Sequence, residues 1–167
     1  MTRQLRPVIG PLIGLIAINA VFFILSPTYR QPVAIRDILE QSAVLHTMAT
    51  GTTIILIAGQ LDLSVGSLLA LVSVVTGSLL FAGLPWWVAL LGGLGAGTLC
   101  GLINGLVIVS TGVPTLVATL GMMMAARGVA NMIGMGKDMS RFPDQFKWLG
   151  AGFVGPVIIT LLAVIIM

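Results

Sequence analysis

The chain has 167 residues, of which 57% are hydrophobic and only 8% charged, and its formal net charge is +3 at pH 7. Soluble domains carry about 25% charged residues, so this composition excludes a water-soluble globule. The charges are spread over a few loops and form no basic cluster typical of nucleic-acid binding. Long, continuous apolar runs predict an all-α, polytopic helical membrane protein with about six transmembrane helices.

The first apolar run covers residues 7–25 and follows two arginines, without a small-residue cleavage site before Ser26. This pattern predicts an uncleaved first span rather than a signal peptide. A polar connection over residues 26–41 leads to a second span, predicted over residues 43–58. The end of that connection, residues 35–42, is compatible with the beginning of the second helix.

The second span carries His46, Thr50 and Thr53 at positions i, i+4 and i+7, which places them on one helical face. Two interpretations of this stripe remain open. The threonine hydroxyls can bond back to carbonyls of their own helix. Alternatively the stripe lines a cavity, because polar groups inside membranes usually face the bundle interior or water.

A short polar break at residues 59–62 separates the second span from a third, predicted over residues 63–83. Its Asp62 is the only acid between Glu40 and Asp138. A carboxylate here is placed to N-cap the third helix, where free N–H groups and the positive dipole end meet. Ser64 and Gly66 follow at once, so the start of this helix is polar and allows other backbones to approach closely.

The fourth span begins at Trp86 and Trp87, whose indole rings suit the membrane–water interface. Glycines recur in it at every fourth position, and we call them the glycine ladder: Gly93, Gly97, Gly101 and Gly105. Such a stripe lets another helix approach until the backbones touch, so we expect tight packing inside one bundle. Asn104 lies beside the last step; a bond between helices is favoured over contact with a ligand hydroxyl.

Pro114 suits the first turn of a fifth helix, so the fifth span is expected to begin there. Polar and larger side chains then form an i+4 line: Thr115, Thr119, Met123, Arg127 and Asn131. A charge inside a membrane costs several kcal/mol, about 2.5–3.5 on insertion scales, so this line must face protein or water. Pairing of Arg127 with a carboxylate is favoured over substrate contact. The candidate partners are Asp37, Glu40, Asp138 and Asp144.

The last part of the chain contains a polar stretch over residues 134–152, where aromatic side chains interleave with charges. We expect this stretch to rest on the membrane surface. A sixth apolar run covers residues 153–167. His46 is the single histidine and Cys100 the single cysteine, and the sequence shows no paired carboxylates or phosphate-binding loop. These features argue against an enzyme and against a metal or cofactor bound by the chain itself.

Three sequence motifs of the chain resemble the motifs of one protein family. The stretch Gly51-Thr-Thr-Ile-Ile-Leu-Ile-Ala-Gly-Gln-Leu-Asp-Leu-Ser-Val-Gly66 is similar to the signature of permeases from bacterial ABC-type monosaccharide importers, the ribose/xylose/galactose group. The usual pattern there is close to Gly-Gly-Ile-Asp-Leu-Ser-Val-Gly, and Gln60 replaces its second glycine. Gly101-Leu-Ile-Asn-Gly105 and Pro114-Thr-Leu-Val-Ala-Thr-Leu-Gly121, followed by Arg127-Gly128, extend the resemblance over nearly all of the chain beyond residue 35.

The resemblance implies that residues 1–167 form a single transmembrane domain, the N-terminal part of a longer ten-helix-type permease. It further implies a multi-pass protein of the bacterial inner membrane with a cytoplasmic N-terminus, although the positive-inside count favours the opposite orientation. The expected partners are cytoplasmic ATP-binding subunits, which bind the ATP, a periplasmic sugar-binding protein and a second permease subunit. The cytoplasmic loop that docks on the ATPase in this family lies outside the 167 residues.

The candidate residues fall into two further groups. Side chains able to contact an uncharged sugar along the translocation pathway are Thr50, Thr53, Asn104, Thr119 and Arg127. The resemblance implies a signature bend at the cytoplasmic edge, formed by Gln60, Asp62, Ser64 and Gly66. An alternative function is a non-transporting membrane remnant, or an assembly partner that pairs through the glycine ladder and lacks the ATPase-coupling loop.

Overall fold

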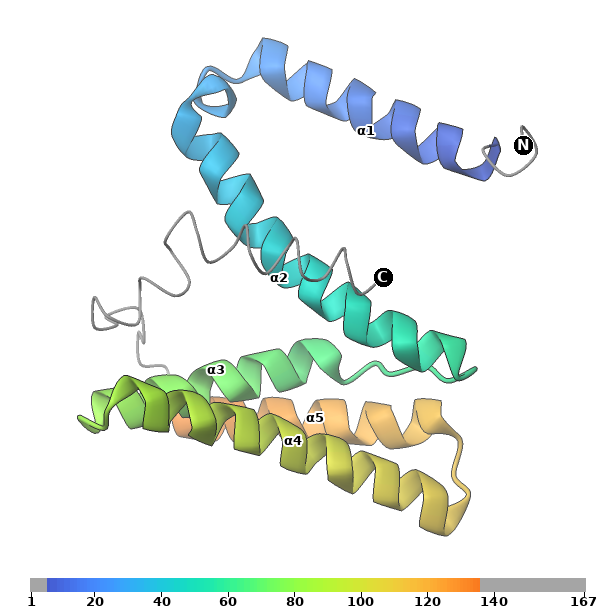
Figure 1. Ribbon diagram of the computed structural model, residues 1–167, viewed down its shortest axis with the longest axis vertical. Helices are drawn as coiled ribbons and strands as arrows, with labels where there is room; N and C mark the ends of the chain where they lie inside the picture. Colours follow the sequence, from blue (N-terminus) through green and yellow to red (C-terminus); the bar gives the residue numbers. More distant parts are fainter. Residues whose placement is uncertain (1–5, 136–167) are drawn as a thin grey trace.

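The computed structural model describes residues 6–135, and within that range every element of secondary structure is a helix (Figure 1). The elements are α1 (Arg6–Leu25), the 3-10 turn η1 (Thr28–Arg30), α2 (Pro32–Ile57), α3 (Val65–Phe81), α4 (Trp86–Thr111) and α5 (Thr115–Gly134). The prediction of an all-α fold is confirmed for this part of the chain. The polar stretch at 134–152 and the sixth apolar run fall outside the described residues, apart from the end of α5.

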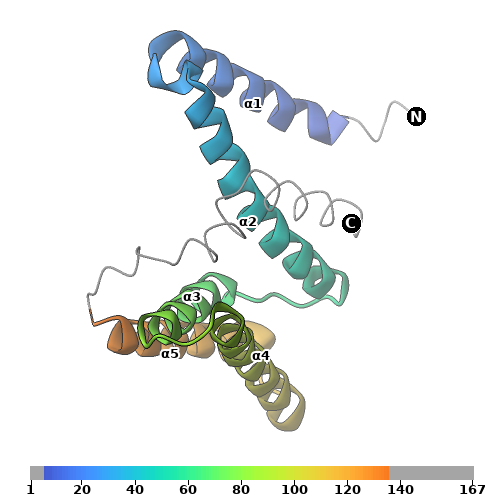
Figure 2. The ribbon, with the colours of Figure 1, turned by 60° about the vertical axis from the view of Figure 1, so that its left-hand side comes forward.

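The last three helices form a bundle in which α3 packs against both α4 and α5. Figure 1 and Figure 2 show these helices side by side, and α4 runs in the opposite direction to α3 and α5. The bundle core joins Leu71 of α3 to Ala126 and Ala130 of α5, with Cys100 of α4 packed against it. Alanines one helical turn apart leave room for the leucine side chain, which lets α3 and α5 approach closely.

Glycines end α2 and α3 in the same way. Gly59 has φ +74° and Gly83 has φ +81°, a left-handed conformation that costs glycine little. After α2, the N–H of Gln60 donates to the carbonyl of Ile55 at 3.1 Å, and after α3 the N–H of Leu84 donates to the carbonyl of Leu79 at 3.2 Å. These are Schellman motifs. They turn the chain sharply enough for α4 to run back along α3.

The first two helices stand apart from this bundle. Both α1 and α2 contact η1, whereas neither packs extensively on α3–α5 within residues 6–135 (Figure 1). Their apolar side chains are accordingly open in this range, as at Leu25, 74% exposed, and Ile57, 83% exposed. Surfaces of this kind need lipid or further protein to cover them.

Two helices, α4 and α5, are long and apolar enough to cross a membrane by length and composition, while the apolar parts of α1 (Ile9–Leu25) and α3 are shorter. The five helices coincide with the first five predicted spans, with one clear difference in extent. α2 begins at Pro32, well before the predicted start at residue 43. The reason is that Pro32 takes a first-turn position, for which its ring is preorganised, and the charged residues after it continue the helix.

Candidate functional site

A cavity forms where the unequal lengths of α3 and α4 leave space. α3 has 17 residues and α4 has 26, and a tight turn joins them at one end. At the other end α4 therefore extends past the start of α3, by about 13 Å at 1.5 Å per residue. The connection over residues 58–64, the end of α2 and the start of α5 border the space beside this extension, which stays open on one side. We call it the junction cavity; its volume is 470 Å³.

Polar groups from three separate segments line the junction cavity: Gln60 and Asp62 from the connection, Asn104 from α4, and Thr115 and Thr119 from α5. The remaining walls are apolar, with side chains such as Ile54 and Ile108, or are bare backbone at Gly101 and Gly105. Carboxylate, amide and hydroxyl groups in an otherwise apolar wall can bind a neutral, hydroxyl-bearing molecule by hydrogen bonds.

A hydrogen-bond network holds the start of α3 at the edge of this cavity. Oδ1 of Asp62 accepts from the N–H of Ser64 at 2.7 Å and from its hydroxyl at 2.6 Å. Nδ2 of Asn104 donates to the same hydroxyl oxygen at 3.4 Å. Ser64 is fully buried and Asn104 nearly so. Each polar group of Ser64 in the network thus has a partner, and Asn104 connects α4 to the beginning of α3.

The expectation that Asp62 N-caps the third helix is wrong. The N-cap is Ser64, and α3 begins at Val65. Asp62 lies two residues earlier, and its carboxylate bonds the Ser64 N–H in an Asx turn instead of the N–H groups of the first helical turn. Gly66 accordingly lies inside the first turn of α3, while Gln60 and Asp62 lie in the connection before it.

The side chain of Gln60 bridges the connection to α5. The hydroxyl of Thr115, the first residue of α5, donates to Oε1 of Gln60. Because Gly59 takes the positive φ of this turn, Gln60 stands in a position that needs no glycine. Thr119, one turn further along α5, is 2% exposed, and its hydroxyl donates to the carbonyl of Leu116 at 3.3 Å.

Two of the predicted pathway residues, Thr50 and Thr53, do not line the junction cavity. Both lie on α2, where their hydroxyls donate to the carbonyls of His46 and Ala49 at 2.8 and 2.7 Å. These bonds agree with the first interpretation of the stripe, in which the threonine hydroxyls bond to carbonyls of their own helix. A hydroxyl bonded in this way can still accept a further hydrogen bond.

Arg127 also lies away from the junction cavity, two turns beyond Thr119 on α5, with an exposed side chain. Pairing with Glu40 or Asp37 is not found: within residues 6–135 the ion pair is that of Arg36 with Glu40, at 2.8 Å. The physical reason is the separation of α2 from the bundle that carries Arg127. Asp138 and Asp144 lie outside the described residues, so pairing with them stays a prediction.

The glycine ladder divides into two halves. A Cβ atom at Gly93 would lie 2.0 Å from Oγ1 of Thr76, and one at Gly97 would lie 2.9 Å from Cγ2 of Val72, so both glycines face α3 at close range. At Gly101 and Gly105 an added Cβ would meet no other group within 4 Å, and both border the junction cavity. The ladder therefore packs helices only as far as α3 extends.

Sequence reasoning placed Asn104 and Thr119 among the pathway candidates and Gln60 and Asp62 in the bend, but it did not connect these groups. It also left Thr115 out of the candidate residues. The signal for Thr115 was its place on the i+4 line with Thr119, whereas its partner Gln60 is 55 residues away. Within residues 6–135 no three metal-ligating side chains come together.

Comparison with known proteins identifies the family of the chain. The model described as "Branched-chain amino acid transport system / permease component" matches residues 34–167. The galactofuranose transporter permease of Escherichia coli K12 is 36% identical over 78% of this chain and 39% of its own length. The ribose import permease of Bacillus subtilis is 32% identical over 95% of the chain and 51% of its own length. The D-allose transport system permease of E. coli K12 is 33% identical over 95% of the chain and 50% of its own length.

No solved structure is detectably similar to the chain. The chain spans about half the length of the curated relatives it matches, from 39% to 51% for the three above. The family match covers most of the chain, including α2 from residue 34, α3–α5 and the junction cavity. The protein therefore belongs to the family of transport-system permease components that this model describes.

Proposed function

We propose that this chain forms part of the transmembrane permease subunit of an ATP-driven monosaccharide importer, and that the junction cavity belongs to its sugar pathway. One observation carries the proposal: in a chain with 8% charged residues, five polar side chains from three segments gather around one cavity. Its 470 Å³ falls in the range of about 300–1,000 Å³ typical of small-ligand sites. The relatives named for ribose, galactofuranose and allose support a sugar as the substrate class.

The polar groups suit an uncharged polyol, since each sugar hydroxyl both donates and accepts a hydrogen bond. Asp62 supplies a carboxylate acceptor, and the amides of Gln60 and Asn104 supply donors and acceptors. Thr119 adds a hydroxyl from the wall formed by α5. Thr50, Thr53 and Arg127 remain candidates for other parts of the pathway, which the assembled transporter would complete.

The proposal extends to architecture and partners. We infer a multi-pass protein of the bacterial inner membrane, with about six spans in this chain and a ten-helix-type permease as the whole. Cytoplasmic subunits would bind ATP, a periplasmic protein would deliver the sugar, and a second permease subunit would complete the pathway. Alternating access requires helices to move relative to one another, and α2 is suited to such movement because it packs little on α3–α5.

Substitution Thr119→Val tests the role of the junction cavity. It keeps the shape of the side chain and removes the hydroxyl, so we expect uptake of the transported sugar to fall about tenfold, the worth of one lost hydrogen bond of about 1.4 kcal/mol. Uptake of labelled D-ribose, D-galactose and D-allose would be measured in a strain that lacks the subunit, with the variant placed in the complete permease. Abundance in the membrane would be determined by immunoblot.

The matched control is Thr98→Val. Thr98 lies on the exposed side of α4, away from the cavity, and its hydroxyl donates to the carbonyl of Leu94 at 2.8 Å. We expect wild-type uptake from this variant. Equal uptake by the two variants at equal abundance would contradict a role of Thr119 in the pathway.

The alternative function, a non-transporting remnant or assembly partner, is favoured by one observation: the apolar surfaces of α1 and α2 are open over much of their length. A partner helix could cover them without any transport. Uptake measurements separate the two functions. No uptake of any of the three sugars, together with stable co-purification with another permease subunit, would support the assembly partner.

A further inference from the structure

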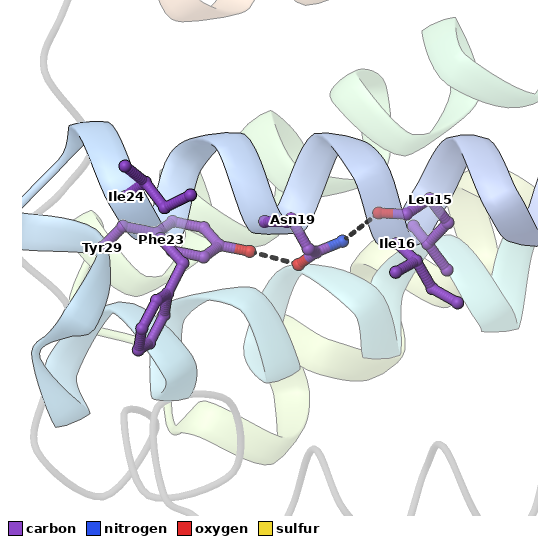
Figure 3. A pocket seen from close by; sticks show the side chains of 7 residues that line it. Leu15, Ile16, Asn19, Phe23, Ile24 and Tyr29 are labelled. Carbon is purple, nitrogen blue, oxygen red and sulfur yellow. Dashed lines mark hydrogen bonds between the residues drawn. The ribbon is translucent and has the colours of Figure 1, made fainter.

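A second cavity lies on α1, far along the chain from the junction cavity. Its volume is 530 Å³, and it is formed by one face of α1 over residues 15–24 together with the side chain of Tyr29 from η1 (Figure 3). We call it the α1 groove. Ile16, Phe23 and Ile24 supply much of its lining. It does not include any residue of the junction cavity.

The polar groups in the α1 groove satisfy one another. The hydroxyl of Tyr29 donates to Oδ1 of Asn19, and Nδ2 of Asn19 donates to the carbonyl of Leu15 at 2.8 Å (Figure 3). The ring of Tyr29 packs beside that of Phe22, with centroids 5.8 Å apart. Because its two polar side chains are paired in this way, the groove offers an apolar surface to a ligand.

A cation lies at the η1 end of the groove. The guanidinium carbon of Arg30 is 5.9 Å from the ring centroid of Phe23, one of the lining side chains. The neighbouring Arg36 is paired with Glu40 at 2.8 Å. Arg30 makes no ion pair with a carboxylate among residues 6–135, Asp37 included. The groove therefore combines an apolar floor with one positive charge that no carboxylate in this range neutralises.

The dimensions of the groove match those of one lipid leaflet. Residues 15–24 of α1 rise about 14 Å along the helix axis. Half of a hydrocarbon core of roughly 30 Å is about 15 Å. Tyr29 and Arg30, at the end of this stretch, are residue types that favour the headgroup region, where an aromatic ring and a cation meet lipid phosphates.

We propose that the α1 groove binds an anionic glycerophospholipid, with one acyl chain along residues 15–24 and the phosphate at Arg30. Charge complementarity selects this occupant: its acyl chain covers the apolar floor and its phosphate brings an anion to Arg30, so one molecule satisfies both features of the groove. The proposal is independent of the sugar pathway, since the two cavities share no residue.

Native mass spectrometry of the full chain in detergent tests this proposal. The chain would be incubated with equal amounts of phosphatidylglycerol and phosphatidylcholine, and the ratio of the two bound lipids measured. We expect the wild-type chain to retain phosphatidylglycerol preferentially. Arg30→Gln is expected to reduce that preference about fivefold, which corresponds to about 1 kcal/mol for one cation near an anionic surface.

Two further variants make the result specific. Arg36→Gln removes an equal charge from the first part of α2, six residues after Arg30, and is expected to keep the preference, because Arg36 is already paired with Glu40. Ala20→Phe fills the groove and is expected to reduce binding of both lipids. Three outcomes would overturn the proposal. The wild type and Arg30→Gln could show the same preference for phosphatidylglycerol, or Arg36→Gln could lose as much of that preference as Arg30→Gln. The third outcome is a second copy of the chain bound in place of lipid. If Ala20→Phe fails to fold, the two arginine variants still decide.

Discussion

Replacing Gly93 by alanine is expected to weaken the packing of α3 on α4 by about 1–3 kcal/mol, the usual cost of forcing an extra carbon into a filled interface. The new Cβ would lie 2.0 Å from Oγ1 of Thr76 and 3.1 Å from the carbonyl oxygen of Val72. The threonine side chain can rotate, but the backbone carbonyl cannot. The two helices must therefore move apart by a few tenths of an ångström, which loosens the contacts around Thr76.

Thermal unfolding in detergent, followed by circular dichroism, measures this effect as a lower midpoint for Gly93→Ala. The control is Gly95→Ala in the same helix, where no group lies within 4 Å of the added carbon. Alanine favours helix by about 1 kcal/mol over glycine, so the control should unfold at the same temperature or higher. Equal midpoints for the two variants would show that Gly93 does not face α3.

Asp62→Ala is expected to destabilise the start of α3. The carboxylate is the acceptor for both the N–H and the hydroxyl of Ser64, a residue with no exposed surface. A buried donor without an acceptor costs about 1–3 kcal/mol, and the variant leaves up to two such groups. We expect a lower unfolding midpoint and, since Asp62 also lines the junction cavity, a loss of sugar uptake in the complete permease.

Two further variants show whether the lost bonds to Ser64 cause the loss of stability. Asp62→Asn keeps an oxygen that can accept from Ser64, so we expect a smaller loss of stability; charge-assisted bonds are roughly twice as strong as neutral ones. Asp37→Ala removes an exposed acid from α2 and should leave the midpoint unchanged. If Asp62→Ala unfolds like the wild type, the bonds to Ser64 contribute nothing to stability.

The helices were predictable because hydrophobic runs and turn residues carry most of the information about where a membrane helix lies. Trp86 begins α4, as expected, and α5 begins at Thr115, directly after Pro114. The start of α2 was placed too late, since Arg36 and Glu40 interrupt the hydropathy signal. In the structure these residues are helical and form an i,i+4 ion pair, so the same charges that hide the helix support it.

The junction cavity was predictable only in part. Helical phase shows which side chains share a face, and it correctly groups Thr115 with Thr119; it does not show which face meets a cavity. For that reason the stripe on α2 and the line on α5 looked equivalent in the sequence, whereas only the second reaches the cavity. The bond between Gln60 and Thr115 depends on the packing of segments 55 residues apart, which no local pattern encodes.

In the proposed multi-pass arrangement, the shortness of α3 affects the bilayer around it. Its 17 residues rise about 26 Å, less than the roughly 30 Å of a typical hydrocarbon core. Lipids beside α3 must compress, or the helix must draw polar connecting residues below the headgroups, at a fraction of a kcal/mol for each ångström of mismatch. The protein should therefore distribute preferentially into thinner membranes. In bilayers of long-chain lipids, we expect the bilayer to thin locally around α3 rather than the helix to tilt.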